Sequence, residues 1–437
     1  MTGFTVLDDP AAHPTTPAVA PDPAHARPHR TAETPGTPGA PDSAAPTWTP
    51  DDGASPGHAE FRFASPRTGL VAHGVRARLD VPSWDGPAVA AAAQELLARA
   101  AGARWAGEPA PILVGAIPFD PSRPAHLVVP AHQSWHPVVS AGAPTDRTAD
   151  DPRPVARPEP SLPGRDDAVF RAAVGRAVSR LEDGVADKVV LARTLDVSAP
   201  GPLDRGAVRA AVRRANPDAY VFDVELPGDQ GHLVGASPEL LVSVRDGVLH
   251  SHPLAGSAPR SADPDEDRAT AQRLLASEKD LREHAFVTDA IREALRAYVA
   301  REEDLDVPAT PELVATSHLW HLGTPVTARL TPGTSVLDVV YALHPTPAVC
   351  GHPQGAAREL IGSLEPFDRG FYTGLVGWAD QAGNGEWAIV LRCGVVRGAD
   401  VRLFAGAGVV VGSTPEGEHA ETAVKFSTLL SALGGVS

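Results

Sequence analysis

A long series of β-rich segments runs through this sequence, and several of them are joined only by short turns. Near the C-terminus, EWAIVLRCGVV and DVRLFAGAGVVV are separated by the turn from Arg397 to Asp400, a pattern that predicts a β-hairpin. Further strands are expected at YVFDVEL, HLVGAS and ELLVSV. Helical segments occur among the strands without the regular alternation that builds a parallel sheet. The sequence therefore predicts an α+β fold with large antiparallel sheets.

Apolar residues recur at helical spacing in other parts of the chain. They predict helices at 88–102, 166–184 and 417–433, and one long amphipathic helix from about 269 to 300. The segment DKVVLARTLDV alternates as a strand does, which places Lys188, Val190 and Ala192 on one face. Lys188 is thus expected near the start of a strand.

The first 56 residues differ in composition from the rest of the chain. They are dense in Pro, Ala, Thr, Asp and His without apolar periodicity, so they bury too little surface to offset the entropy lost on ordering. We expect a disordered tail at residues 1–56 and a single large domain at residues 57–437. A second stretch rich in Pro, Arg and Asp, at 141–165, is expected to be a long surface loop.

The charge and the cysteine count argue against several classes of protein. A formal net charge of −16 argues against a nucleic acid or an anionic membrane as partner, because such surfaces repel an acidic chain. No apolar run approaches the ~20 residues of a membrane span, and the N-terminus lacks a signal-peptide pattern. Cys350 and Cys393 are the only cysteines, too few for a disulfide framework. These features predict a cytoplasmic protein.

Lysine is nearly absent from this chain. Of the 38 basic residues, only Lys188, Lys279 and Lys425 are lysines. An amine can lose its proton when it is desolvated, whereas a guanidinium effectively cannot. The three lysines are therefore candidates for positions that arginine cannot fill, although their presence by chance is the alternative.

Two of the predicted helices each carry a pair of carboxylates spaced three residues apart. Asp280 and Glu283 share one helix face, while Glu418 and Glu421 share another, with Lys425 one turn further on. If the two faces meet, they form an oxygen-rich pocket suited to Mg²⁺, which takes one or two carboxylates together with waters and substrate oxygens. The alternative is that both faces are solvated and that Glu421 and Lys425 form an ordinary helix ion pair.

A candidate acid and a candidate base lie on β-rich segments. Glu239, in GASPELL, is expected at a turn-to-strand junction, where partial burial would favour its protonated form and let it act as a general acid. Lys188 could be the complementary base if its surroundings favour the neutral amine. A structural role is the alternative for each residue.

Other polar and glycine-rich segments fit an anionic ligand. Arg392, in AIVLRCG, could bind a carboxylate with both guanidinium nitrogens, or could form a cross-strand ion pair. The segments HPLAGSAPR and FAGAGVVVGS bring backbone N–H groups to strand ends. His321 and His344 are expected in proline-bearing loops without metal-ligand spacing, so structural and catalytic roles both stay open for them.

Taken together, these motifs resemble the chorismate-utilising enzymes of menaquinone, siderophore and tryptophan pathways. The resemblance runs from about Phe61 to the C-terminus and is carried, in order, by VGAIPFDPSRP, KVVLAR, GASPELL, HPLAGSAPR, LLASEKDLREH, LWHLGTP, LHPTPAVCGHP, SLEPFDRGFYTGLVGW, GNGEWAIVLRCG, LFAGAGVV and GEHAETAVKFSTLL. The chain looks most like the isochorismate synthases that feed 2,3-dihydroxybenzoate siderophores. The resemblance implies one large chorismate-binding catalytic domain, built on two packed antiparallel sheets with the active site in a deep cleft.

The resemblance also implies roles for particular residues. Lys188 would be the general base that activates water for attack on the second ring carbon, and Glu239 the acid that assists departure of the hydroxyl at the fourth. The enolpyruvyl carboxylate would be contacted by Arg392, Tyr372 and Gly406. The pocket wall and further substrate contacts would come from Ala255, Gly256, Ser257, His321, Ala348, Val349, Leu391 and Lys425.

The metal site implied by the resemblance uses the same acidic residues as the helix pattern. Glu283 and Glu421 would hold Mg²⁺, with Asp280 and Glu418 supporting them. The cation would in turn hold the ring carboxylate of chorismate, and no redox cofactor is expected.

A few positions separate the members of this family. Anthranilate synthases typically have glutamine where Lys188 stands, and aminodeoxychorismate synthases have lysine where Ala255 stands. Salicylate synthases, which go on to expel pyruvate, usually read AGT where this chain reads AGS at Ser257, so isochorismate is the expected product. Tyr372 and Leu391, however, resemble the salicylate synthase pattern, so that activity is the alternative.

A third hypothesis is a non-catalytic chorismate-binding or scaffold protein that docks a partner through its tail. Intact Lys188, Glu239, Glu283 and Glu421 argue against it. Chorismate is therefore the expected partner, with transient contacts to downstream enzymes that use isochorismate.

Overall fold

The computed structural model describes residues 5–6, 60–81, 83, 88–103, 108–137, 165–199 and 201–434. The predicted tail, apart from the short strand β1 (Thr5–Val6), lies outside the described residues, as does the predicted loop at 141–165 apart from its last residue. The backbone of β1 pairs with strand β6 (Lys188–Ser198) in antiparallel register.

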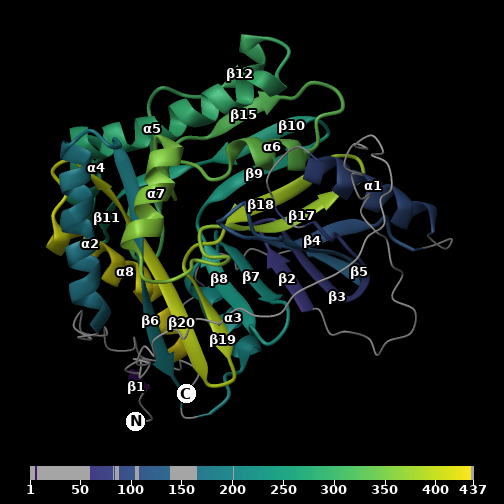
Figure 1. Ribbon diagram of the computed structural model, residues 1–437, viewed down its shortest axis with the longest axis horizontal. Helices are drawn as coiled ribbons and strands as arrows, with labels where there is room; N and C mark the ends of the chain where they lie inside the picture. Colours follow the sequence, from purple (N-terminus) through teal and green to yellow (C-terminus); the bar gives the residue numbers. More distant parts are fainter. Residues whose placement is uncertain are drawn as a thin grey trace, which may run out of the picture.

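Antiparallel strands dominate the fold (Figure 1). Within the described ranges, 17 strands form one hydrogen-bonded network. Besides β1 and β6, these are β2 (Glu60–Ala64), β3 (Thr68–Arg78), β4 (Ile112–Ile117), β5 (His126–Pro137), β7 (Tyr220–Glu225), β8 (His232–Ser237), β9 (Leu240–Arg245), β10 (Val248–His252), β12 (Leu305–Asp306), β15 (Val326–Arg329), β16 (Gly351–His352), β17 (Leu375–Asp380), β18 (Gly385–Ile389), β19 (Cys393–Arg397) and β20 (Asp400–Val410). A second, 3-stranded sheet contains β11 (Leu254–Pro259), β13 (Glu312–Ala315) and β14 (Leu319–Gly323). The predicted α+β fold with large antiparallel sheets is confirmed.

The large network is arranged as two groups of strands that pack on each other. Figure 1 shows β6, β20 and β19 on one side and β3, β4, β5 and β17 on the other, and the pairing of β2 with β7 joins the two groups. Both groups contribute to one apolar core, which includes Phe63 of β2, Phe222 of β7, Val376 of β17 and Phe404 of β20. Burial of these large side chains is the main stabilising contribution to the packing of the two groups.

The predicted C-terminal hairpin is present, but its first half is not a single strand. β19 pairs with β20 from Cys393 opposite Phe404 to Arg397 opposite Asp400. The chain breaks between β18 and β19, where Arg392 has a φ of 49°. Because this left-handed backbone conformation interrupts a strand, β18 pairs with β17 and β9 whereas β19 pairs with β20 and β8. The prediction that Arg392 lies on a strand was wrong.

Helices cover the outer faces of the strands (Figure 1). The predicted helices at 88–102, 166–184 and 417–433 are found as α1, α2 and α8. The described helices are α1 (Ala88–Gly102), α2 (Arg165–Glu182), α3 (Arg205–Ala215), α4 (Pro264–Leu275), α5 (Glu278–Leu295), α6 (Val336–Leu343), α7 (Gln354–Leu364) and α8 (Pro415–Gly434), with short 3₁₀ turns at Arg296–Tyr298 and Glu302–Asp304. None of them, within the described residues, is both long and apolar enough to span a bilayer.

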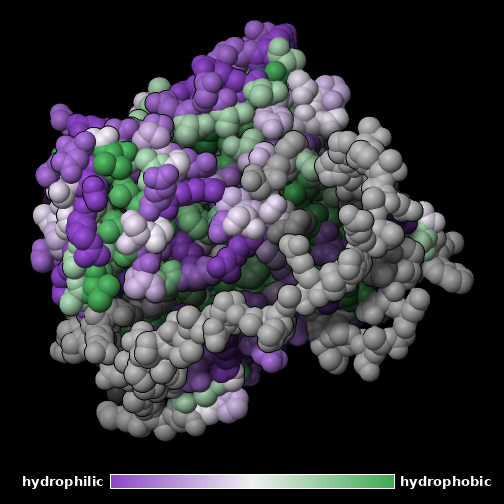
Figure 2. Space-filling view, in the orientation of Figure 1, coloured by the Kyte–Doolittle hydropathy of each residue, from purple (hydrophilic) through white to green (hydrophobic). Residues whose placement is uncertain are grey.

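The predicted long helix from 269 to 300 is instead two helices. α4 ends at Leu275 and α5 begins at Glu278. The Ser277 side chain accepts a hydrogen bond from the backbone N–H of Asp280, and such a cap favours a new helix start over continuation of the old one. The break leaves Lys279 and Asp280 in the first turn of α5. The C-terminal end of α5, together with the segment before β12, forms the largely hydrophilic upper edge seen in Figure 2.

Candidate active site

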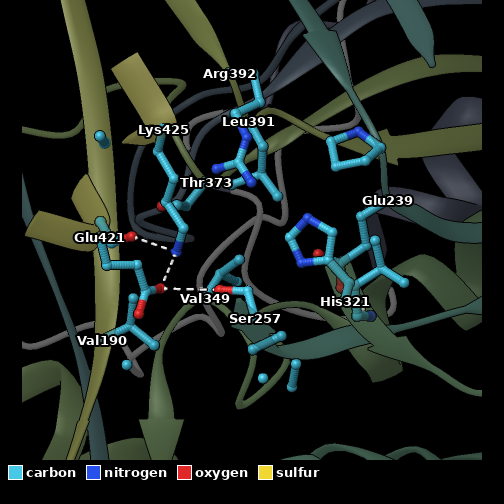
Figure 3. A pocket seen from close by; sticks show the side chains of 18 of the residues that line it. Val190, Glu239, Ser257, His321, Val349, Thr373, Leu391, Arg392, Glu421 and Lys425 are labelled. Atoms are coloured by element: carbon cyan, nitrogen blue, oxygen red, sulfur yellow. Dashed lines mark hydrogen bonds and ion pairs between the residues drawn. The ribbon is translucent and has the colours of Figure 1, made fainter. Parts of the chain in front are cut away.

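One pocket brings together most of the residues that the sequence predicted as a site (Figure 3). Its walls come from β6, β11, β14, β20, α5 and α8, and from the segments between β8 and β9, between α6 and β16, before β17 and after β18. The predicted residues that line it are Glu239, Ala255, Gly256, Ser257, Glu283, His321, Ala348, Val349, Tyr372, Leu391, Arg392, Gly406, Glu421 and Lys425. Lys188, Asp280 and Glu418 lie beside the pocket rather than on its wall.

The acidic faces of α5 and α8 converge on this pocket. Glu283 of α5 and Glu421 of α8 both line it, and the Ser257 hydroxyl of β11 donates to Glu421 Oε1 over 3.3 Å. Gly256, at a φ of +81°, lets β11 approach α5 closely, because a β-carbon there would lie 3.1 Å from Cβ of Asp280. Two helices that are distant in sequence thus present carboxylates to one cavity.

Each of the three lysines in the sequence is paired with one of these acids. Lys188 Nζ lies 2.9 Å from Oε1 of Glu283. Lys425 Nζ lies 2.5 Å from Oε1 of Glu421. Lys279 Nζ lies 3.5 Å from Oε1 of Glu418.

The fourth acid, Asp280, has no lysine partner and instead accepts a hydrogen bond from the Ser277 hydroxyl. The scarcity of lysine in the composition therefore corresponds to one place in the structure, where all three amines face carboxylates.

The pKa values of these acids show that their negative charges repel one another. Burial, reinforced by the charge of Glu421, raises the pKa of Glu418 to about 6. Burial and the neighbouring Glu283 also raise the pKa of Asp280. Burial opposes ionisation of Glu421 as well, but the cations Lys425, Lys279 and Arg392 together outweigh it, and the pKa of Glu421 is lowered. The cluster thus holds more negative charge than its surroundings favour.

Carboxylates that are buried close together and repel one another are suited to binding a hard divalent cation. Within the described residues, no three His, Cys, Asp or Glu side chains are gathered tightly enough to form a metal cage. Mg²⁺ does not need such a cage, because it keeps several waters and takes only one or two carboxylates together with substrate oxygens. The oxygen donors of Glu283 and Glu421 are of the type that Mg²⁺ prefers.

Glu239 is placed as the sequence predicted, between the end of β8 and the start of β9. Its side chain is buried in the pocket wall, and its Oε1 accepts a hydrogen bond of 3.3 Å from the backbone N–H of Leu254. Burial raises the pKa of Glu239 to about 7. A carboxyl group with this pKa can donate a proton near neutral pH.

Arg392 presents an unpaired guanidinium to the pocket. Figure 3 shows Arg392 and Lys425 pointing into the same space, with Glu239 and His321 across from Glu421. Within the described residues the guanidinium makes no hydrogen bond or ion pair, so the predicted alternative of a cross-strand ion pair is not what the structure shows. A half-buried cation without a protein partner is suited to an anionic ligand.

The two histidines singled out from the sequence lie in different places. His321 lies in strand β14, directly opposite Ser257 of β11, so the prediction of a loop was wrong. Burial lowers the pKa of His321 well below its usual value, and its Nε2 has no hydrogen-bond partner. His344 follows α6, outside the pocket lining, and burial lowers its pKa to about 3. Both side chains are therefore neutral at pH 7.

Two features of the site were not found from the sequence. Gly408 of β20 lies beside the acids, since a β-carbon there would come within 2.4 Å of Oε1 of Glu283. Arg369 is fully buried and donates to the carbonyl oxygens of Val349 and Val190, at 2.9 Å and 2.7 Å, while paired with Glu365. The motifs FAGAG and EPFDRG contain both residues, but only the folded contacts show what they touch.

Comparisons with known proteins show which family the chain resembles. Residues 131–434 match the model of a family described as chorismate binding enzyme. The chain is 40% identical over 385 residues to isochorismate synthase DhbC of Bacillus subtilis, covering 86% of this chain and 93% of that protein. It is 41% identical over 379 residues to isochorismate synthase EntC of Escherichia coli K12, covering 86% and 94%.

Solved structures show the same similarity. A Bacillus anthracis protein assigned as a 2,3-dihydroxybenzoate-specific isochorismate synthase, DhbC, superimposes with a TM-score of 0.77 at 39% identity, covering 86% of this chain and 96% of that one. The component I of anthranilate synthase from Streptococcus pneumoniae shares the fold, with a TM-score of 0.61 at 20% identity over 86% of this chain and 93% of that one.

Proposed function

The chain belongs to the chorismate-binding enzyme family, and we propose that it converts chorismate into isochorismate. The observation that carries this proposal is Glu239, a buried carboxyl with a pKa of about 7 that shares one pocket with an unpaired arginine and the acids paired to Lys188 and Lys425. An acid, an amine and a carboxylate-binding cation are the groups that this reaction requires. The names of the relatives at about 40% identity support the same activity.

The chemistry is an exchange of one hydroxyl position for another. Lys188 takes a proton from a water molecule whose oxygen bonds to the second ring carbon. Both conjugated double bonds of the ring shift, and the carbon–oxygen bond at the fourth carbon breaks. Glu239 donates its proton to the departing hydroxyl, which leaves as water. One water is consumed and one is released, so the product is an isomer of the substrate. For this step the Lys188 amine must be neutral when the substrate is bound.

The remaining pocket residues bind and orient the substrate. Arg392, with the hydroxyl of Tyr372 and the backbone at Gly406, would hold the enolpyruvyl carboxylate. Tyr372 is itself fixed by stacking on Phe404, with ring centroids 5.1 Å apart. The walls at Ala255, Gly256, Ser257, Ala348, Val349 and Leu391 would enclose the ring, with His321 and Lys425 beside it.

Mg²⁺ would be held by Glu283 and Glu421, with Asp280 and Glu418 supporting them. When bound, it would neutralise and orient the ring carboxylate. The protein's own contribution is to keep these acids together, through the ion pairs with the lysines and the hydrogen bond from Ser257.

A second candidate function is salicylate synthase, in which isochorismate formation is followed by loss of pyruvate. Tyr372 and Leu391, both at the pocket wall, favour it, whereas Ser257 favours isochorismate as the final product. The purified protein incubated with chorismate and Mg²⁺ separates the candidates. Isochorismate by chromatography without pyruvate supports the synthase, while stoichiometric pyruvate supports the lyase.

We further propose that the product feeds a 2,3-dihydroxybenzoate siderophore, because a structural relative is described as specific for that compound. Transient contacts with enzymes that consume isochorismate would fit this role. Cys350 and Cys393 are both free and buried, as suits the reducing cytoplasm where we place the reaction. A non-catalytic scaffold is the remaining alternative, and it predicts chorismate binding without any turnover.

A further inference from the structure

Lys279 differs from the other two lysines in how tightly it is held. The side chains of Lys188 and Lys425 are 1% and 14% exposed, whereas that of Lys279 is 47% exposed. Lys425 also donates a hydrogen bond of 2.8 Å to the carbonyl oxygen of Gly406. Lys279 makes no hydrogen bond within the described residues, and its pair with Glu418 spans 3.5 Å. It can therefore leave the cluster without breaking a hydrogen bond.

Glu418, by contrast, is nearly inaccessible to water. Its side chain is 5% exposed, so its charge is poorly solvated and depends on a nearby cation. Lys188 and Lys425 are already paired with Glu283 and Glu421. Lys279 is thus the one lysine that balances Glu418 from the solvent side.

We propose that Lys279 is a mobile internal counter-ion of the magnesium site. Its ammonium balances Glu418 while no metal is bound, and it swings into solvent when a divalent cation takes over that role. The inference rests on the proposed function, from which it takes the metal site. Because two cations within a few ångströms repel each other, Lys279 and the metal compete, and the lysine weakens metal binding.

Magnesium binding in the absence of chorismate tests this competition. Isothermal titration calorimetry would compare the wild-type protein with Lys279→Met, Lys279→Arg and Arg282→Met. Arg282 is the matched control, since it is exposed, lies on the same helix and loses the same charge. We expect Lys279→Met to bind Mg²⁺ roughly fivefold more tightly, the change that a half-exposed ion pair can produce. Lys279→Arg and Arg282→Met should bind as the wild type does.

Thermal unfolding without metal provides a second measurement. In EDTA, Lys279→Met should unfold at a lower temperature than the wild type, because Glu418 loses its cationic partner and keeps only, among the described residues, the hydrogen bond with Ser413. Saturating Mg²⁺ should remove that difference.

The possible contrary results separate the inference from its premise. Equal or weaker Mg²⁺ binding by Lys279→Met would overturn the counter-ion role and leave the metal site intact. An equal gain in Arg282→Met would make the effect one of net charge and would also overturn the role. If the wild-type protein binds no Mg²⁺, the proposed metal site fails, and the inference fails with it.

Discussion

The amine of Lys188 lies 2.9 Å from Oε1 of Glu283, and both side chains are largely buried beside the same pocket. Although the Lys188 amine is close to Glu283, it does not have the geometry of a hydrogen bond with any described residue. The contact is therefore mainly electrostatic. It links the proposed base to one of the proposed metal ligands.

Replacing Lys188 by Arg should abolish turnover. A guanidinium keeps the positive charge beside Glu283 but cannot accept a proton from water. We expect kcat to fall by at least ~100-fold, the usual contribution of a general base, while chorismate binding persists. Turnover by isochorismate chromatography and binding by calorimetry check this. Retained turnover would remove Lys188 from the role of base. If Lys188→Ala binds chorismate normally and the wild type has no activity, the scaffold alternative is correct.

Activity should fall as the pH rises through about 7, because Glu239 must be protonated to act as an acid and burial raises its pKa to about 7. Because the Lys188 amine is neutral in the substrate complex, the value of kcat is expected to drop about tenfold per pH unit above that point. A pH–rate profile of the wild-type protein is the measurement. A profile that stays flat between pH 6 and pH 9 would contradict the assignment of Glu239.

The same residue should make stability depend on pH. The pKa of Glu239 rises from 4.5 to about 7 on folding, so its contribution to stability is complete below 4.5 and is lost as the pH rises through about 7. That loss is on the order of 3 kcal/mol. Denaturant unfolding at several pH values should show it in the wild type and not in Glu239→Gln. Identical pH dependence in the wild type and in Glu239→Gln would show that Glu239 is not the cause of this loss of stability.

Gly408→Ala should impair activity more than stability. The new β-carbon would lie 2.4 Å from Oε1 of Glu283 and 3.2 Å from Cε of Lys188, so the flexible Glu283 side chain must move. We expect a loss in kcat/KM with a nearly unchanged melting temperature. Gly362→Ala in α7 is the control, because a β-carbon there meets nothing within 4 Å. Equal activity in both variants would show that the position of Glu283 is not critical.

Arg369→Ala should destabilise the whole domain. Its side chain and that of Glu365 are each 3% exposed and lie 2.6 Å apart, and removing one partner of a buried pair typically costs about 3–5 kcal/mol. The double variant Arg369→Met with Glu365→Leu should be less destabilised than Arg369→Ala, since no unpaired charge stays buried. Denaturant unfolding measures both. If the double variant is the less stable one, the charge itself is not the cause.

The sequence predicted which residues share a helix face, but not which charges they would meet. The spacing of Asp280 with Glu283, and of Glu418 with Glu421, is local and could be read directly. That Lys279 pairs with Glu418 depends on how α5 and α8 dock, and no periodicity contains this information. The scarcity of lysine was a usable compositional signal, although it did not indicate the partners.

Interruptions of regular secondary structure were the second reason why predictions from the sequence were wrong. EWAIVLRCGVV has the composition of one strand, but the left-handed conformation at Arg392 divides it into β18 and β19, which pair with different neighbours. Likewise, apolar spacing continues from α4 into α5, and only the cap at Ser277 separates them. In both cases tertiary contacts or a single polar side chain outweighed a correct local pattern.

The lysine–carboxylate pairs also affect how chorismate, a dianion, approaches the site. Before a divalent cation binds, the four acids are formally matched by the three lysines and Arg392, so the charges of the pocket nearly cancel. An approaching dianion instead meets the field of a chain with a net charge of −16. Dissolved salt screens that repulsion, so capture of chorismate should quicken, rather than slow, as the ionic strength rises.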